Sequence, residues 1–163
     1  MKNISKYLSL ILPHLGVLLI VFALILGYFY NWRGKAVLLK TDKTNVYITT
    51  NNELKIVPFA LTLAQFSADF YEIDKPKHFE AQILVEENNK TKTILLQVNH
   101  PIKMGFGQDL YLLSYDNNNL ENPEWCTVEL VYDPFQKIFF IGIVLLVLGL
   151  VFSTLFPLQF HYF

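Results

Sequence analysis

The chain has 163 residues, of which 53% are hydrophobic and 15% aromatic, and its mean hydropathy is +0.33. This is too apolar for an ordinary soluble domain, and the excess is concentrated at the two ends. All 14 acidic residues fall between Asp42 and Asp133, and 11 of the 13 basic residues fall between Arg33 and Lys137, which gives the middle region a formal charge of −3. That balance argues against nucleic acid as a partner.

The N-terminal end contains an uncharged run of 24 residues, from Tyr7 to Tyr30. As a helix it would be about 36 Å long, enough to cross a hydrocarbon core of about 30 Å. The run is longer than a signal-peptide core and no small-residue cleavage site follows it, so we expect a retained anchor. A second uncharged run of 19 residues, 138–156, predicts a second span.

Two spans place both termini on the same side of the membrane, and Lys2 and Lys6 favour the cytoplasm for that side. We therefore expect a multi-pass protein of the cytoplasmic (inner) membrane with three parts. Residues 1–32 form the N-terminal tail and transmembrane helix 1, residues 33–136 form an extracytoplasmic β domain, and residues 137–163 form transmembrane helix 2 and a short tail.

One polar side chain, His14, lies inside the first span, about 10 Å along the helix from Tyr7. A polar group in hydrocarbon needs a partner or a path to water, because an unpaired one is costly. Two roles satisfy this need. His14 can form a hydrogen bond to a neighbouring helix, or it can be an axial ligand of a metal or haem.

The middle region has the pattern of an all-β domain, in which short apolar stretches alternate with polar residues and are separated by clusters of Asn, Lys, Asp and Pro. The predicted strands cover residues 36–40, 45–49, 54–57, 59–63, 66–71, 78–86, 91–98, 109–115 and 125–132. Residues 87–90 are a candidate hairpin turn. We expect a mainly antiparallel sheet, curled or stacked as a small sandwich, with the single cysteine, Cys126, reduced on its apolar face.

Enzyme signatures are absent from the sequence, which has no phosphate-binding glycine loop, GxSxG, HExxH, CxxC or CxxCH. We therefore assign no catalytic residue. His78 and His100 are far apart in the sequence, and we expect each to be an exposed histidine at a strand end or turn rather than a metal ligand.

Several segments resemble, in order and spacing, the ResB family of system II cytochrome c biogenesis proteins. Residues 95–116 are similar to its V-N-x-P-[LI]-x-x-x-G-[FY] run and S-Y-D strand, at positions Val98, Asn99, Pro101, Ile102, Gly105, Phe106, Ser114, Tyr115 and Asp116. An upstream proline-phenylalanine segment is matched by Pro58, Phe59, Leu61, Leu63 and Phe66. Three further segments resemble the same family. They are KPKHFEAQILV, which resembles its next strand, VELVYDPFQK, which resembles the entry to its final span, and PHLG around His14, which resembles its histidine-bearing span.

This resemblance to a short form of ResB implies a function in haem handling. ResB proteins act with a CcsA-type polytopic membrane protein to move haem outward and attach it to apocytochrome c, and a histidine in this span is proposed to bind haem b. The resemblance makes His14 the candidate ligand of the haem iron. It implies a non-catalytic subunit of a haem-attachment (cytochrome c synthase) complex. The alternative is a non-enzymatic structural subunit of another membrane complex.

A bis-histidine haem site needs a second imidazole. The other histidine near the membrane, His161, follows the second span and would lie beyond the hydrocarbon. We therefore expect the second ligand to come from another chain.

Overall fold

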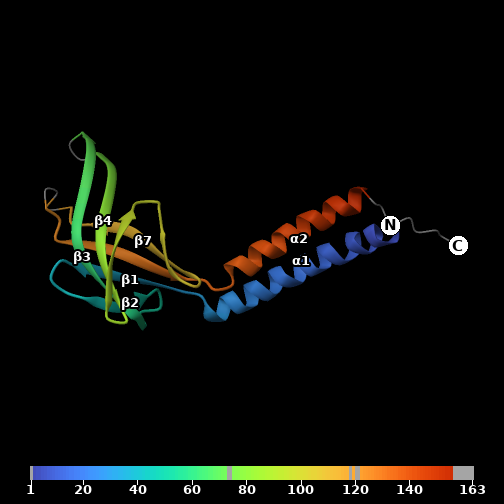
Figure 1. Ribbon diagram of the computed structural model, residues 1–163, viewed down its shortest axis with the longest axis horizontal. Coiled ribbons are helices and arrows are strands. Elements are labelled where there is room, and N and C mark those ends of the chain that lie inside the picture. Colours follow the sequence, from blue (N-terminus) through green and yellow to red (C-terminus); the bar gives the residue numbers. More distant parts are fainter. Residues whose placement is uncertain (1, 73–74, 118, 120–121, 156–163) are drawn as a thin grey trace. The chain divides into compact units, whose positions relative to one another are not determined.

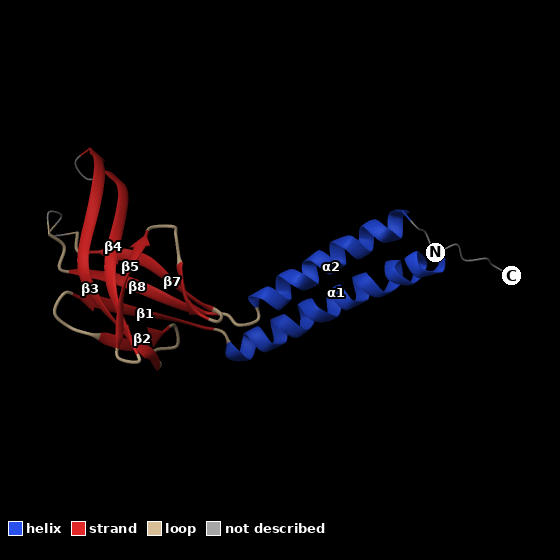
Figure 2. Cartoon of the chain, viewed as in Figure 1, coloured by secondary structure: helices blue, strands red, loops and turns tan. Residues whose placement is uncertain are grey.

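The structure, a computed structural model, describes residues 2–72, 75–117, 119 and 122–155. Along this part of the chain, one apolar helix precedes and another follows an antiparallel sheet of eight strands (Figure 2). Met1–Asn31 and Asp133–Phe163 form one compact unit, which we call the helix unit, and Trp32–Tyr132 form a second, the sheet unit. The predicted fold class is confirmed.

The helix unit contains α1 (Lys2–Tyr30) and α2 (Gln136–Leu155), which run antiparallel side by side (Figure 1). Both are long and apolar enough to cross a membrane. In the most apolar 18-residue stretch of each helix, only 11% is buried within the chain. A core helix of a soluble protein would be mostly buried, so the exposed leucines, valines and phenylalanines favour a lipid environment.

Small residues bring the two helices together. Ser9, Gly16 and Ala23 recur every seven residues on α1 and are buried, as are Gly142 and Gly149 on α2. A Cβ atom at position 16 would lie 2.5 Å from the backbone nitrogen of Leu146, which shows how close the backbones are. Such small-residue seams are a common way for membrane helices to associate.

The sheet unit is one continuous antiparallel sheet with the strand order β5-β4-β3-β2-β1-β8-β7-β6. Its strands are β1 (Trp32–Leu39), β2 (Thr44–Thr49), β3 (Leu54–Glu72), β4 (Lys75–Glu87), β5 (Lys90–Gln97), β6 (Ile102–Gly105), β7 (Gln108–Tyr115) and β8 (Trp125–Tyr132). Asn88 and Asn89 both have positive φ between the paired residues Glu87 and Lys90, which confirms the hairpin turn predicted there.

Two details of the strands differ from the sequence prediction. β3 is one strand of 19 residues, whereas the sequence predicted three shorter ones interrupted at Pro58. The register between β2 and β3 shifts in this stretch, since Thr44 pairs with Leu61 but Val46 pairs with Ile56. Pro58 lies within that irregularity, where its missing N–H does not interrupt regular pairing. The four-residue strand β6 was not predicted, because its alternation is too short to recognise.

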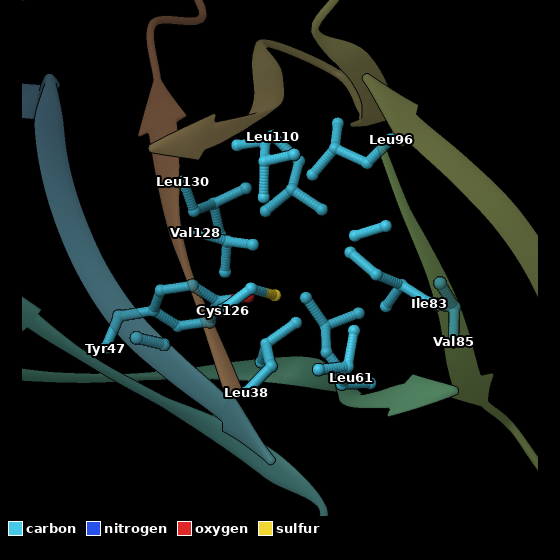
Figure 3. Packing of buried hydrophobic residues seen from close by; sticks show 14 of the residues in the cluster. Leu38, Tyr47, Leu61, Ile83, Val85, Leu96, Leu110, Cys126, Val128 and Leu130 are labelled. Atoms are coloured by element: carbon cyan, nitrogen blue, oxygen red, sulfur yellow. The ribbon is translucent and has the colours of Figure 1, made fainter. Parts of the chain in front are cut away.

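The sheet curls around one hydrophobic core (Figure 3). Tyr115 of β7 stacks on Phe66 of β3 with ring centroids 4.8 Å apart, although three strands separate β3 from β7 in the sheet order. Cys126 is fully buried and free, as predicted, and burial raises the pKa of its thiol to about 12. The other fully buried large side chains are Tyr47, Leu38, Leu61, Leu63, Ile83, Leu96, Leu110, Leu130, Val85, Val128 and Pro123.

Candidate functional site

His14 lies in the middle part of α1, on the side turned away from α2. Gly16 faces α2. Each residue of a helix turns the side-chain direction by about 100°, so the side chain of His14, two residues earlier, points about 200° away from that of Gly16. The imidazole is correspondingly exposed within this chain. Within this chain His14 therefore forms no bond to α2, and a bond to a helix of another protein stays a prediction.

A hydrogen bond to its own helix fixes the imidazole. His14 Nδ1 lies 2.6 Å from the carbonyl oxygen of Leu10, one turn earlier. A carbonyl can only accept, so Nδ1 carries the proton and donates it. In the neutral ring, Nε2 then keeps its lone pair and points away from the backbone. Metal-binding histidines usually have this arrangement, with one ring nitrogen bound to a carbonyl and the other free to coordinate.

The surroundings of His14 are entirely aliphatic. Leu10, Ile11, Leu15 and Leu18 line a shallow, open hollow of about 390 Å³ beside the imidazole, all of them on the same side of α1. An apolar hollow with one nitrogen lone pair matches the needs of a haem, which has an apolar ring and an iron that takes an axial imidazole. The residues present would thus suit one face of a haem, with a nitrogen lone pair beside an apolar surface.

Next to His14, Pro13 creates a defect that α2 repairs. Proline has no N–H, so Pro13 cannot donate the usual helical hydrogen bond to the carbonyl oxygen of Ser9. The hydroxyl of Ser153 on α2 lies 2.9 Å from that oxygen and donates to it, sharing its proton with the carbonyl of Gly149 at the same distance. Such a bond from a neighbouring helix is how membrane helices tolerate proline.

Gly149 makes this contact possible. A Cβ atom there would lie 2.3 Å from Cδ of Pro13 and 2.4 Å from its backbone nitrogen. The turn before His14 is therefore held against α2 on one side while the imidazole projects from the other. Sequence reasoning missed this contact, although the seven-residue spacing of Gly142 and Gly149 was a usable signal.

The remaining histidines lie elsewhere. His100 is in the turn after β5, where its Nδ1 lies 3.1 Å from the carbonyl oxygen of Val98. His78 lies within β4 rather than at its end, with Nε2 3.6 Å from an oxygen of Glu80. The pKa of Glu80 is lowered, chiefly by the hydrogen bond that Gln97 donates to it. His161 lies outside the described residues.

Among the described residues, no second histidine lies beside His14, and no three His, Cys, Asp or Glu side chains form a metal-binding group. The described residues near His14 supply one ligand and an apolar surface. A complete bis-histidine site would need a further imidazole from outside them.

Comparison with known proteins gives one family. The model of the ResB-like family matches residues 1–123, which is three quarters of the chain and includes α1, His14 and the strands β1 to β7. No curated protein matches the sequence. ResB-like proteins are linked to cytochrome c biogenesis. With most of its length matched, from the histidine-bearing helix to strand β7, this chain belongs to the ResB-like family.

Proposed function

We propose that this chain is a membrane subunit of a system II cytochrome c biogenesis complex, in which haem is moved across the membrane and attached to apocytochrome c. The observation that carries this is the free Nε2 of His14, fixed by the bond to Leu10 and set in an aliphatic hollow of a ResB-like protein. A CcsA-type polytopic membrane protein would be the partner.

In this proposal His14 provides one axial ligand to haem b. Bound haem would supply an iron centre that accepts a nitrogen lone pair. The leucines at positions 10, 15 and 18 would cover part of the ring and exclude water. Leu10 has a second task, since its carbonyl holds the proton on Nδ1 and so directs Nε2 toward the ligand.

The position of His14 supports a site shared between two chains. The imidazole projects from the side of α1 that α2 does not cover, so a helix of another protein can approach it directly. Burial between two helices would give the exposed aliphatic residues of this side a partner other than lipid. The second axial ligand would then come from the CcsA-type protein.

We also propose the orientation expected from the sequence, with both termini in the cytoplasm and the sheet unit outside the inner membrane, where apocytochrome c is matured. Lys2 and Lys6 before the first span support it. The chain would bind and position haem as a non-catalytic subunit. A purely structural role in another membrane complex remains the competing function, and it predicts no dependence on His14.

The test is the haem-to-protein ratio of the complex purified with its partner, measured by absorption for the wild type and for His14→Ala. Alanine is well tolerated in membrane helices, so the variant should insert normally. We expect haem content to fall about tenfold or more, and cytochrome c maturation with it. Added imidazole should restore part of both, because it fits the space left by the side chain.

Val21→Ala is the matched control, since Val21 is exposed on α1 two turns beyond His14 and does not line the hollow. It should keep most of its haem. Equal ratios for wild type and His14→Ala at equal expression would refute the haem-ligand role and favour the structural one.

A further inference from the structure

The hydrogen bond that fixes the imidazole of His14 spans a proline. Its two ends are His14 Nδ1 and the carbonyl oxygen of Leu10, 2.6 Å apart, and Pro13 lies between these residues in the sequence. A membrane helix bends most easily at a proline, because the ring crowds the carbonyl four residues earlier and cannot donate to it. The acceptor therefore belongs to the turn before this weak point, whereas the imidazole follows it.

The second helix holds the turn that carries the acceptor. The hydroxyl of Ser153 on α2 donates to the carbonyl oxygen of Ser9, the residue next to Leu10, over 2.9 Å. Gly149 of α2 lies directly against Pro13, because a Cβ atom on this glycine would collide with the proline ring. Contacts with α2 thus lie on both sides of Leu10 in the sequence. They fix the position of its carbonyl relative to the imidazole.

The tautomer of His14 depends on that position. A neutral imidazole carries one proton, and the Leu10 carbonyl selects the form with the proton on Nδ1 and the lone pair on Nε2. When the carbonyl is out of reach, this selection is lost and both tautomers are populated. A ring with its proton on Nε2 cannot coordinate through that nitrogen. A contact on one side of α1 therefore controls a lone pair on the other side.

We propose that Ser153 is a positioning residue for the haem ligand. By holding the Ser9 carbonyl against α2, it keeps the neighbouring Leu10 carbonyl in place, and that carbonyl keeps the proton on Nδ1. The inference rests on the proposed function for its purpose, but the effect of Ser153 on the tautomer requires no haem. A serine that only joins the two helices would stabilise their pairing and leave the tautomer of His14 unchanged.

The first test needs no haem. Nuclear magnetic resonance of the full chain in lipid nanodiscs, with isotope-labelled histidine nitrogens, distinguishes the two tautomers at about pH 8, where an ordinary histidine is neutral. The signals of His14 are identified by their loss in His14→Ala. We expect the Nδ1–H form to dominate in the wild type, and Ser153→Ala to raise the share of the Nε2–H form about twofold or more.

Two further variants control for packing. Ser153→Thr keeps a hydroxyl at the same position and should restore the wild-type share. Thr154→Ala removes a neighbouring hydroxyl that donates to the Val151 carbonyl within α2, and it should change nothing. An unchanged share in Ser153→Ala, or an equal change in Thr154→Ala, would overturn the proposal.

The proline provides a second test of the same route. Pro13→Ala returns an N–H that can donate to the Ser9 carbonyl, so the bond from Ser153 becomes dispensable. Ser153→Ala should then have no further effect on the tautomer when it is combined with Pro13→Ala. An effect of the same size in both backgrounds would mean that Ser153 does not act through the proline turn, and the proposal would be wrong.

Haem provides the last measurement, in the complex purified with its partner. The electron paramagnetic resonance signal of low-spin haem depends on the orientation of its axial imidazoles. Ser153→Ala should keep most of its haem but shift this signal, and Ser153→Thr should not shift it. An unshifted signal in Ser153→Ala would remove the link to haem. If His14→Ala kept its haem, the proposed function would fail, whereas the tautomer measurement would still decide the role of Ser153.

Discussion

The helix unit and the sheet unit achieve burial in opposite ways. The sheet unit packs large side chains such as Leu61, Leu130 and Tyr47 into a core that is complete within the chain. The helix unit buries small residues, Ser9 and Gly16 among them, and leaves most of its large apolar side chains exposed. The contrast shows that the large apolar side chains of the sheet unit are shielded from water by one another. Those of the helix unit need lipid or a partner protein to shield them.

Truncating a large core residue should therefore have the largest effect. Leu130 is fully buried on β8, which pairs with both β1 and β7. Leu130→Ala leaves a cavity and should lower the free energy of unfolding by about 2–5 kcal/mol. Denaturant unfolding of the full chain in detergent, followed by tryptophan fluorescence, measures it. Leu95→Ala, at an exposed position, should cost much less; similar losses in both would mean that the core is not packed as described.

In the helix unit, enlarging a residue should be the damaging change. Gly149→Ala places a methyl group 2.3 Å from Pro13 Cδ, so the helices must move apart at a cost of about 1–3 kcal/mol. Gly27→Ala is the matched control, because its Cβ meets only the flexible side chain of Asn31, at 3.0 Å. There the better helix propensity of alanine should give a gain of up to about 1 kcal/mol. Thermal unfolding in detergent should thus show shifts of opposite sign.

The sequence predicted the features that depend on local pattern. Uncharged length located both helices, and the Asn88–Asn89 pair located a hairpin turn, because asparagine tolerates positive φ. Pro58 misled the strand prediction because only the pairing with β2 shows that the ladder is irregular there. His14 was identifiable by its type and depth, but its orientation depends on a seam of small residues that binds α2 to the opposite side. Such contacts are properties of the packed pair of helices, and no single segment reveals them.

A pH experiment sharpens the view that the sheet core is closed to water. Burial raises the pKa of the Cys126 thiol to about 12 from an ordinary value near 9. Below pH 9 the thiol is protonated in both the folded and the unfolded chain. The contribution of the buried thiol to the free energy of unfolding is then fully present. Between pH 9 and 12 the unfolded chain loses the proton while the folded chain keeps it, so stability falls by about 1.4 kcal/mol per pH unit.

Burial raises the pKa of Tyr47 as well, so the contribution of the thiol must be isolated by substitution. Cys126→Ala should be less stable at neutral pH but should lose stability less steeply from pH 9 to 11. Urea unfolding at several pH values gives both slopes. Parallel slopes would show that the thiol reaches water in the folded state.

The smallest effect concerns the hydroxyl that repairs the proline defect. Ser153→Ala removes the bond from α2 to the Ser9 carbonyl, to which Pro13 has no N–H to donate. We expect a loss of about 0.6–2 kcal/mol, the range for one hydrogen bond between two membrane helices. Thr154→Ala is the control, since its hydroxyl bonds only to Val151 O within α2.

Stability alone does not show that the contact joins the two helices, so a cysteine pair across the seam provides the second measurement. Cysteines can replace Leu12 of α1 and Leu146 of α2, whose backbones lie against the seam glycines Gly149 and Gly16, so that disulfide formation reports how closely α1 and α2 stay together. Ser153→Ala should slow crosslinking, and Thr154→Ala should leave its rate unchanged. An unchanged rate in both would mean that the glycines hold the helices together without the serine, and that the orientation of His14 rests on the small-residue seam.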